Sequence, residues 1–232
     1  MKIGLWNVDH PEYDKSKARR HKRFDDVLNG LQQRDCDVLI ITEANAAMQL
    51  EGYYSAFSDE SPFLKKSRNY EKPNSYRQIG IYSKDPIEQV QIPEPINGVL
   101  YRTLWQWQPL AIYGNVMTIK DQWKTDSHST YNDRVDEQIE IMRQLVAERC
   151  LVGGDLNLKL GWASKKRAYN RVADFVNESG LVWPTKERTD TVQHVIHSAN
   201  FKVSISVDSS VQHSKGKRNS LSDHPFVLIE AH

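Results

Sequence analysis

The stretch LVGGDLN, residues 151–157, joins a short apolar run to two glycines, a carboxylate and a carboxamide. An apolar run of this length favours a buried strand, and glycine lets the backbone turn without a steric penalty. Because side chains alternate along an extended chain, Asp155 and Asn157 are expected to face the same side. An acceptor-only group beside a donor-acceptor group suits a water molecule next to a phosphate. Taken alone, the same residues are also typical of an ordinary turn at a strand end.

Length and composition favour one globular domain over residues 1–232. Hydrophobic residues make up 39% and charged residues 26% of the chain, which is typical of a soluble globular protein. No apolar run approaches the length of a membrane span, and residues 1–6 are too short and too soon polar for a signal peptide. We therefore expect a cytoplasmic protein without a membrane partner, and a monomer by default.

Cysteine content and net charge exclude some classes of function. Cys36 and Cys150 are the only cysteines, and each precedes an apolar run, where cysteine is usually a small buried hydrophobe. A disulfide framework and a cysteine-based zinc site are both excluded. The net charge of +1 gives no overall signal for a polyanionic partner, so binding of nucleic acid has to depend on local patches.

Hydrophobic periodicity predicts strands and helices along the whole chain. Strands are expected at 2–6, 37–43, 78–83, 99–107, 110–119, from 151, and at 181–183, 191–197, 201–207 and 226–230, with helices at 16–33, 130–149 and 165–179. Residues 87–92 are expected to pair with 78–83 as a hairpin. Residues 52–74 show no clear period and predict a long irregular loop.

Polar groups stand at or just after the ends of several predicted strands. Asn7 follows the first strand, Glu43 ends the second, Asp155 and Asn157 follow the apolar run at 151, and Ser222-Asp223-His224 precedes the last strand. Mg²⁺ needs few protein oxygens because it keeps several waters and takes substrate phosphate oxygens. The inventory therefore fits a magnesium phosphoryl site. It does not fit zinc, because the histidines lack a helical pair or a cysteine partner.

The order of these motifs resembles the endonuclease/exonuclease/phosphatase superfamily, which includes pancreatic-type deoxyribonuclease and exonuclease III. The motifs that carry the resemblance are Trp6-Asn7, Thr42-Glu43, Gly80-Ile81-Tyr82-Ser83-Lys84, Gly154-Asp155-Leu156-Asn157 and Ser222-Asp223-His224-Pro225. Each motif is weak alone, but together they run in the right order from the first strand to the last. The resemblance implies an α/β fold of four layers, in which two packed mixed sheets are flanked by helices.

The resemblance also implies a role for each motif residue. Glu43 would be the main ligand of Mg²⁺ or Mn²⁺, with Asn7 and Asp223 helping to place the metal. Asp155 would orient or deprotonate the attacking water. Asn157 and His224 would hold the scissile phosphate, and His224 would also stabilise charge that develops in the transition state.

Two departures from the family pattern affect the expected activity. Gln193 stands where members usually carry an aspartate that supports the catalytic histidine; its amide oxygen could accept a hydrogen bond from His224, but it carries no charge. The run Ala111-Ile112-Tyr113-Gly114-Asn115-Val116 lacks a histidine found in many members. Tyr113 or Asn115 could supply a phosphate contact instead.

Basic and aromatic residues near two motifs favour a nucleic acid substrate. Trp162, Lys165, Lys166, Arg167, Tyr169 and Arg171 follow the Gly-Asp-Leu-Asn motif, and Lys215, Lys217 and Arg218 precede the Ser-Asp-His motif. Such groups can neutralise phosphates and stack bases, although each is as compatible with a solvated helix face. A nuclease acting on DNA or RNA is therefore expected first. The alternatives are a phosphatase or phosphodiesterase acting on a small phosphorylated molecule or lipid head group, and a catalytically weakened nucleic-acid-binding module.

Overall fold

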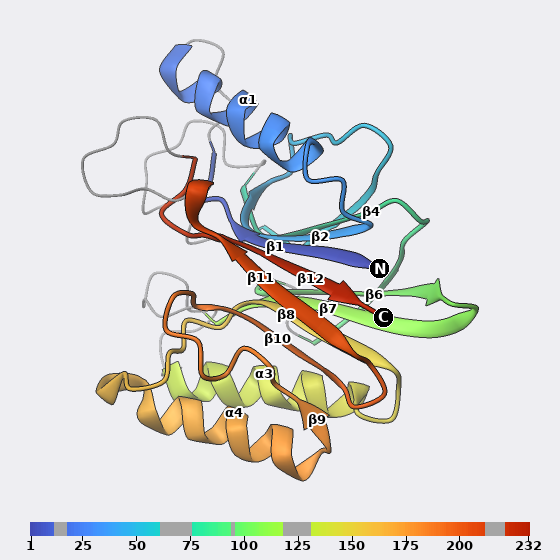
Figure 1. The fold of residues 1–232 in the computed structure, drawn as a ribbon, viewed down its shortest axis with the longest axis vertical. Helices are drawn as coiled ribbons and strands as arrows, with labels where there is room; N and C mark the ends of the chain where they lie inside the picture. The colour runs from blue at the N-terminus through green and yellow to red at the C-terminus, as the bar shows by residue number, and fades with distance from the viewer. Residues whose placement is uncertain (12–17, 61–75, 94–95, 118–130, 212–220) are drawn as a thin grey trace.

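Two mixed β-sheets of six strands each pack face to face, and helices cover their outer faces (Figure 1). The computed structural model describes residues 1–11, 18–60, 76–93, 96–117, 131–211 and 221–232. This is the α/β sandwich that the sequence predicts. No helix in these ranges is long and apolar enough to cross a membrane.

The first sheet has the strand order β11-β12-β1-β2-β4-β3. Its strands are β1 (Lys2–Asn7), β2 (Val38–Asn45), β3 (Tyr54–Phe57), β4 (Tyr76–Ser83), β11 (Val203–Asp208) and β12 (Phe226–Ala231). β1 runs parallel to β2 and antiparallel to β12. Helix α1 (Ala18–Gln32) covers the outer face, where Phe24, Val27 and Leu31 are buried in one cluster with Trp6 and Leu39.

The second sheet has the strand order β5-β6-β7-β8-β10-β9. Its strands are β5 (Glu88–Val90), β6 (Gly98–Trp105), β7 (Gln108–Val116), β8 (Cys150–Asp155), β9 (Leu181–Val182) and β10 (Gln193–Ser198). Helices α3 (Tyr131–Leu145) and α4 (Lys166–Glu178) lie on its outer face (Figure 1). Short 3₁₀ turns, η3 (Ala163–Lys165) and η4 (Ser209–Val211), complete the described elements.

The sheets approach each other closely at β1 and β8, the strands that lead to the first and fourth motifs. A Cβ atom added to Gly153 would lie 2.8 Å from Leu5 Cδ2 and 3.0 Å from Ile40 Cδ1, so only glycine fits without repacking. Leu5, Ile40 and Leu151 belong to the apolar cluster between the sheets. This packing fixes the ends of β1, β2 and β8 relative to one another.

Two sequence expectations about strand pairing were wrong. Residues 88–90 form β5, which pairs with β6 in the second sheet and not with β4. The free side of β4 is taken by β3, which lies within the stretch expected to be irregular. Both strands are short and largely exposed, so they lack the long alternating pattern that predicts a strand.

The turn between β6 and β7 lies two residues earlier than expected. Gln106 and Trp107 both have positive φ, 52° and 62°, which is the geometry of a two-residue hairpin turn. Pro109 lies inside β7, opposite Leu104. The separator expected at 108–109 is therefore part of a strand.

Candidate active site

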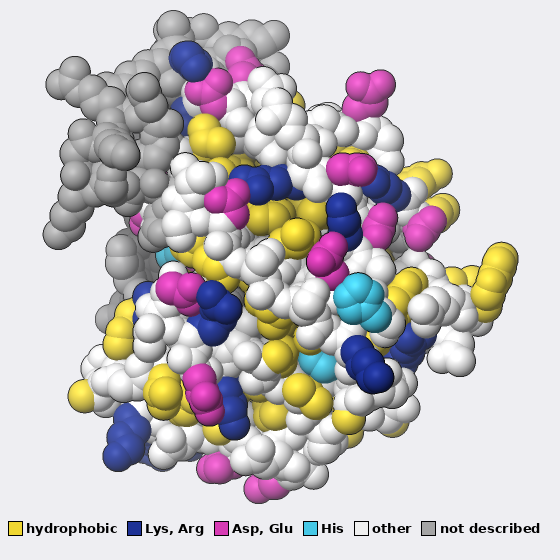
Figure 2. Space-filling model, in the orientation of Figure 1, with side chains coloured by type: hydrophobic (Ala, Val, Ile, Leu, Met, Phe, Trp, Pro, Cys, Tyr) yellow, Lys and Arg dark blue, Asp and Glu magenta, His cyan; other side chains and the backbone are white. Residues whose placement is uncertain are grey.

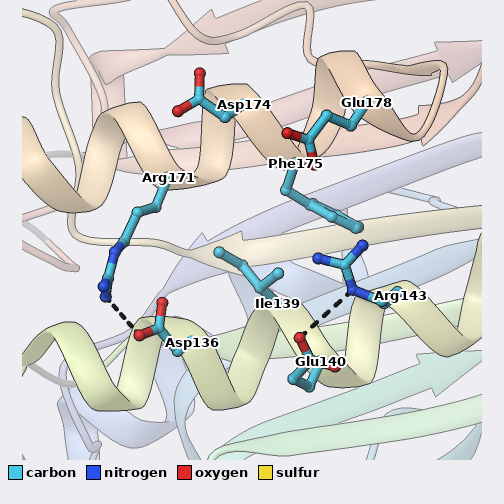
Figure 3. Close-up of a pocket in the computed structure, with 8 residues that line it drawn as sticks. All are labelled: Asp136, Ile139, Glu140, Arg143, Arg171, Asp174, Phe175 and Glu178. Atoms are coloured by element: carbon cyan, nitrogen blue, oxygen red, sulfur yellow. Dashed lines mark hydrogen bonds and ion pairs between the residues drawn. The ribbon is translucent and has the colours of Figure 1, made fainter.

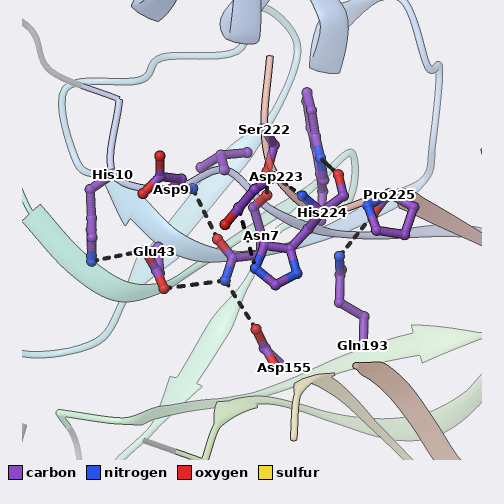
Figure 4. A network of polar contacts seen from close by, with 12 residues as sticks. Asn7, Asp9, His10, Glu43, Asp155, Gln193, Ser222, Asp223, His224 and Pro225 are labelled. Atoms are coloured by element: carbon purple, nitrogen blue, oxygen red, sulfur yellow. Dashed lines mark hydrogen bonds and ion pairs between the residues drawn. The ribbon is translucent and has the colours of Figure 1, made fainter. Parts of the chain in front are cut away.

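Asn7, the last residue of β1, connects one carboxylate from each sheet. Its Nδ2 donates to Glu43 Oε1 at 3.3 Å and to Asp155 Oδ2 at 3.0 Å (Figure 4). Its Oδ1 accepts the backbone N–H of Asp9 at 2.9 Å. The side chain is almost fully buried, and these partners fix which end of the amide faces the carboxylates.

Glu43 lies within β2, which continues to Asn45, and not at the end of the strand as expected. Its φ is 53°, an unusual conformation for a residue other than glycine. The backbone carbonyl of Glu43 accepts the N–H of His10 at 2.9 Å, so the segment after β1 follows β2 at this point. Strain of this kind persists only where neighbouring structure holds it, and here the hydrogen bond from His10 holds the Glu43 backbone.

Asp9 and His10 are neighbours of the site that the sequence analysis did not identify. Figure 4 shows His10 joined to Glu43 and Asp9 joined to Asn7. His10 Nε2 lies 3.4 Å from Glu43 Oε2, and its side chain has no exposed surface. The sequence did hold a signal for Asp9, because it stands two positions after Asn7, just beyond the strand predicted at 2–6.

Asp155 is the buried carboxylate of the group, with 1% of its surface exposed. Burial raises its pKa above the usual range, although the nearby His224 and the hydrogen bond from Asn7 favour the ionised form. Its Oδ1 accepts the backbone N–H of Asn157 at 2.9 Å. A carboxylate with a raised pKa is a better proton acceptor from water at neutral pH than an ordinary aspartate.

The backbone around Asp155 depends on Gly154. Its φ is 153°, and a Cβ atom there would lie 1.8 Å from the carbonyl oxygen of Asn115. β8 ends at Asp155, and Asn157 has a φ of 51° with its Nδ2 bonded to the carbonyl of Met117 at 3.0 Å. A turn, and not strand alternation, therefore determines the orientation of Asn157.

The fourth segment of the site carries Ser222, Asp223 and His224. Ser222 Oγ donates to the carbonyl of Asn7 at 2.5 Å and accepts the N–H of His224 at 3.0 Å. Trp6 Nε1 donates to the carbonyl of His224 at 3.1 Å. Figure 4 shows the imidazole directed toward Asn7 and Asp155. Its Nε2 lies 3.3 Å from Asp223 Oδ1, so a carboxylate does face the ring.

Gln193 lies opposite Asp155 in the β8–β10 pair. Its Nε2 donates to the carbonyl of Pro225 at 2.8 Å, and its buried Oε1 has no hydrogen-bond partner among the described residues. The hydrogen bond expected from His224 to this oxygen is not formed. Gln193 instead holds the backbone that follows the histidine.

Tyr113 and Asn115, expected to contact a phosphate, are fully buried behind the site. The hydroxyl of Tyr113 and the Nδ2 of Asn115 both donate to Gln138 Oε1 of α3. Their side chains thus join β7 to the outer helix, and the structure does not bring them to the surface where a substrate would lie.

Trp162 and Lys165 lie just before α4, in the segment that follows Asp155 and Asn157. Trp162 is 39% exposed, and Lys165 Nζ lies 3.3 Å from the centre of the Tyr131 ring. The Tyr131 hydroxyl donates to the carbonyl of Leu156 at 3.3 Å, which connects this group to the segment after Asp155. Arg218, with the rest of the basic run at 215–218, lies outside the described residues.

The site offers hard oxygen donors and no thiolate. Within the described ranges, no group of three or more His, Cys, Asp or Glu side chains is arranged to hold a metal ion. Mg²⁺ does not need such a group, because waters and substrate oxygens complete its shell. The Glu43 side chain is 27% exposed and Asp223 is 63% exposed, so both carboxylates can reach a cation. This donor set fits a hard divalent cation.

A separate hollow of about 230 Å³ lies between α3 and α4 (Figure 3). Arg171 pairs with Asp136 across it, and Arg143 pairs with Glu140 on one helix. Asp174 and Glu178 also line it, so its acidic side chains outnumber its basic ones. None of the motif residues lines it.

The chain belongs to the endonuclease/exonuclease/phosphatase family, whose model matches residues 4–224. Proteins of this family typically hydrolyse phosphoester bonds and generally use divalent metal ions. No curated protein matches the chain by sequence.

Solved structures with the same fold share little sequence with this chain. The 3′ phosphatase NExo from Neisseria, bound to a product DNA hairpin, is 14% identical with a TM-score of 0.65, covering 100% of this chain and 99% of its own. The human Nocturnin catalytic domain is 14% identical with a TM-score of 0.67, and the match covers 100% of this chain and 93% of that domain. The endonuclease domain of TRAS1, a telomere-specific non-LTR retrotransposon, is 13% identical with a TM-score of 0.64. The match covers 99% of this chain and 97% of that domain.

Proposed function

We propose that this protein is a divalent-metal-dependent phosphodiester hydrolase that cleaves nucleic acid, DNA or RNA. The observation that carries the proposal is the contact of one Asn7 amide with Glu43 of the first sheet and Asp155 of the second. The convergence of a partly exposed carboxylate, a buried carboxylate and an imidazole suits attack of water on a phosphate.

In this proposal, Glu43 is the main ligand of Mg²⁺ or Mn²⁺, assisted by Asn7 and Asp223. A bound divalent ion supplies Lewis acidity that neutralises charge on the phosphoryl oxygens. Asn7 keeps the Glu43 carboxylate in place through the hydrogen bond from its Nδ2.

Asp155 orients the attacking water and takes its proton, which its raised pKa favours. His224 contacts the scissile phosphate and stabilises the charge that develops there. Asn157 follows Asp155 on the same turn and contributes a phosphate contact.

Residues in the segment that follows Asp155 support a nucleic acid substrate. Trp162 offers a partly exposed indole for base stacking, with Lys159 Nζ 5.5 Å from the ring centre. Lys165 adds a cation close to the turn that carries Asp155. The related NExo structure was solved with a DNA hairpin, and the TRAS1 domain is an endonuclease.

The experiment that tests the proposal is cleavage of labelled single-stranded DNA, duplex DNA and RNA with Mg²⁺, Mn²⁺ or chelator. Metal-dependent cleavage is expected in wild type and is expected to be lost in Asp155→Asn. Asp174→Asn is the matched control, because Asp174 is an exposed aspartate on α4. Cleavage that survives in Asp155→Asn would contradict the site assignment.

A small phosphorylated molecule or lipid head group is the second candidate. It is favoured by the net charge of +1 and by the mixing of basic and acidic side chains on the face in Figure 2. Metal-dependent hydrolysis of an aryl phosphate, unaffected by excess duplex DNA and absent for every polymer, would select this candidate over a nuclease.

A further inference from the structure

Arg23 of α1 contacts two of the four segments that form the candidate active site. Its Nη2 donates to the carbonyl of Val8 at 2.7 Å and to the carbonyl of Leu221 at 2.9 Å. Its Nη1 donates to the carbonyl of Asp9 at 3.2 Å, and Nη2 lies 3.5 Å from Asp9 Oδ2. One guanidinium therefore joins the segment after β1 to the segment before β12.

The chemistry of these contacts requires arginine. Three backbone carbonyls from two segments converge on one side chain, and each needs a donor when it is removed from water. A guanidinium presents several N–H groups in one rigid plane, whereas a lysine ammonium is a compact point charge on a flexible stem. Lysine can keep the charge but cannot satisfy this arrangement of acceptors.

The two segments that Arg23 joins carry the groups proposed for catalysis. Val8 and Asp9 directly follow Asn7, and Leu221 directly precedes Ser222. Ser222 Oγ bonds the carbonyl of Asn7 and the N–H of His224, so it connects the same two segments a short distance away. Ser222 thus cross-links the two segments at Asn7, and Arg23 cross-links them at the two residues that follow.

We propose that Arg23 is a positioning residue, which sets the separation between Asn7 and His224 without touching the substrate. If the cross-link is lost, the Asn7 amide can move away from Glu43 and Asp155, to which it is joined only by single hydrogen bonds. The activity part of this proposal rests on the proposed hydrolase function, whereas the structural part does not.

The test compares Arg23→Lys and Arg23→Ala with Arg34→Lys. Arg34 is a matched control because its side chain is 28% exposed, against 26% for Arg23, and it also pairs with an aspartate, Asp208, at 2.6 Å. It lies over the ring of Phe226, the first residue of β12, and pairs with none of the carbonyls that Arg23 contacts. All variants are first compared with wild type by circular dichroism, and Arg23→Lys is the variant most certain to fold.

The first readout is amide hydrogen exchange, which needs no turnover. Residues 4–11 and 221–225 are expected to exchange faster in Arg23→Lys than in wild type, with α3, α4 and β8 unchanged. Arg34→Lys is expected to leave both segments at the wild-type rate. Wild-type exchange in the two segments of Arg23→Lys, or the same increase in Arg34→Lys, would overturn the proposal.

The second readout is hydrolysis under the conditions in which wild type is active. Arg23→Lys is expected to lower kcat by about 10- to 100-fold, the range typical of residues that orient metal-site groups, with a much smaller change in KM. Guanidinium ion added to Arg23→Ala is expected to restore part of the rate. Wild-type kcat in Arg23→Lys would overturn the positioning role. Absence of hydrolysis in wild type would instead refute the proposed function and leave hydrogen exchange to judge Arg23.

Discussion

Gln193 Nε2 donates to the carbonyl of Pro225 at 2.8 Å, directly after the histidine of the site. The glutamine is fully buried and lies opposite Asp155 in the neighbouring strand. In this protein the residue that replaces the family aspartate therefore supports the histidine segment through its backbone. The imidazole instead has the carboxylate of the adjacent residue, Asp223, at 3.3 Å.

Gln193→Asp is expected to destabilise the protein at neutral pH. The shorter side chain loses its donor to Pro225 and places a second carboxylate opposite buried Asp155, so the free energy of unfolding should fall by about 2 to 5 kcal/mol. Urea unfolding measures this loss. Gln89→Asp is the control, because Gln89 also donates to a backbone carbonyl, that of Phe57, but at an exposed site. Equal free energies of unfolding for the two variants would show that the buried hydrogen bond from Gln193 to Pro225 does not stabilise the protein.

Gly154→Ala is expected to lower the free energy of unfolding by about 3 kcal/mol or more, because the new Cβ would overlap the Asn115 carbonyl oxygen at 1.8 Å. Gly161→Ala separates this clash from backbone strain. Gly161 also has a positive φ, 87°, but a Cβ there would meet nothing within 4 Å, so the cost should be about 1 to 2 kcal/mol. Urea unfolding compares both variants with wild type, and similar losses would contradict the predicted clash.

Stability should fall as the pH falls below the ordinary histidine pKa, because of His194. Burial lowers the pKa of His194 from 6.5 to about 4, and its Nε2 contacts the carbonyl of Leu158 at 2.8 Å. Below pH 6.5 the unfolded chain takes up a proton that the folded protein excludes until about pH 4. The loss is about 1.4 kcal/mol per pH unit, or about 3 kcal/mol over this window.

The His194 contribution can be isolated with His194→Asn. Urea unfolding of both proteins across this pH window gives two curves, and their difference cancels the groups that they share. The difference should shrink as the pH falls, because only wild type loses stability through His194. Parallel curves would mean that His194 titrates normally in the folded protein.

Added Mg²⁺ or Mn²⁺ should raise the melting temperature, and chelation should reverse the increase. A ligand that binds only the folded state at about 100 times its Kd adds about 2.7 kcal/mol of stability. The increase should be lost in Glu43→Gln, which keeps the shape of the proposed metal ligand but not its charge. Glu140→Gln on α3 is the control and should respond like wild type. An unchanged increase in Glu43→Gln would remove Glu43 as a ligand.

The sequence predicts the central strands and the motif positions well, because they combine strong apolar runs with strand-end polar residues. β1, β2 and β8 lie where the patterns place them, and the groups of Asn7, Glu43, Asp155 and His224 do converge. Each of these features is signalled by a few neighbouring residues in the sequence. The two-sheet fold then brings the motif residues together.

Features that depend on distant partners could not be predicted from the pattern. Tyr113 sits in a strand next to the site, but its hydroxyl is directed to Gln138 of α3, 25 residues away in the sequence. The carbonyl of Pro225 sets the direction of the Gln193 amide. The contacts of Arg23 are to backbone carbonyls, which every residue has, so the sequence gives no sign of them. Short β5 has no periodicity from which its partner can be read.

The contact of Asn7 with both carboxylates also has a kinetic consequence for the folding chain. Glu43 belongs to one sheet and Asp155 to the other, so neither sheet carries a complete set of groups before the two have docked. A newly made chain that has formed only its first sheet holds Asn7 and Glu43 without their buried partner. Recovery of hydrolysis after refolding should therefore lag behind recovery of secondary structure and report directly on docking of the sheets.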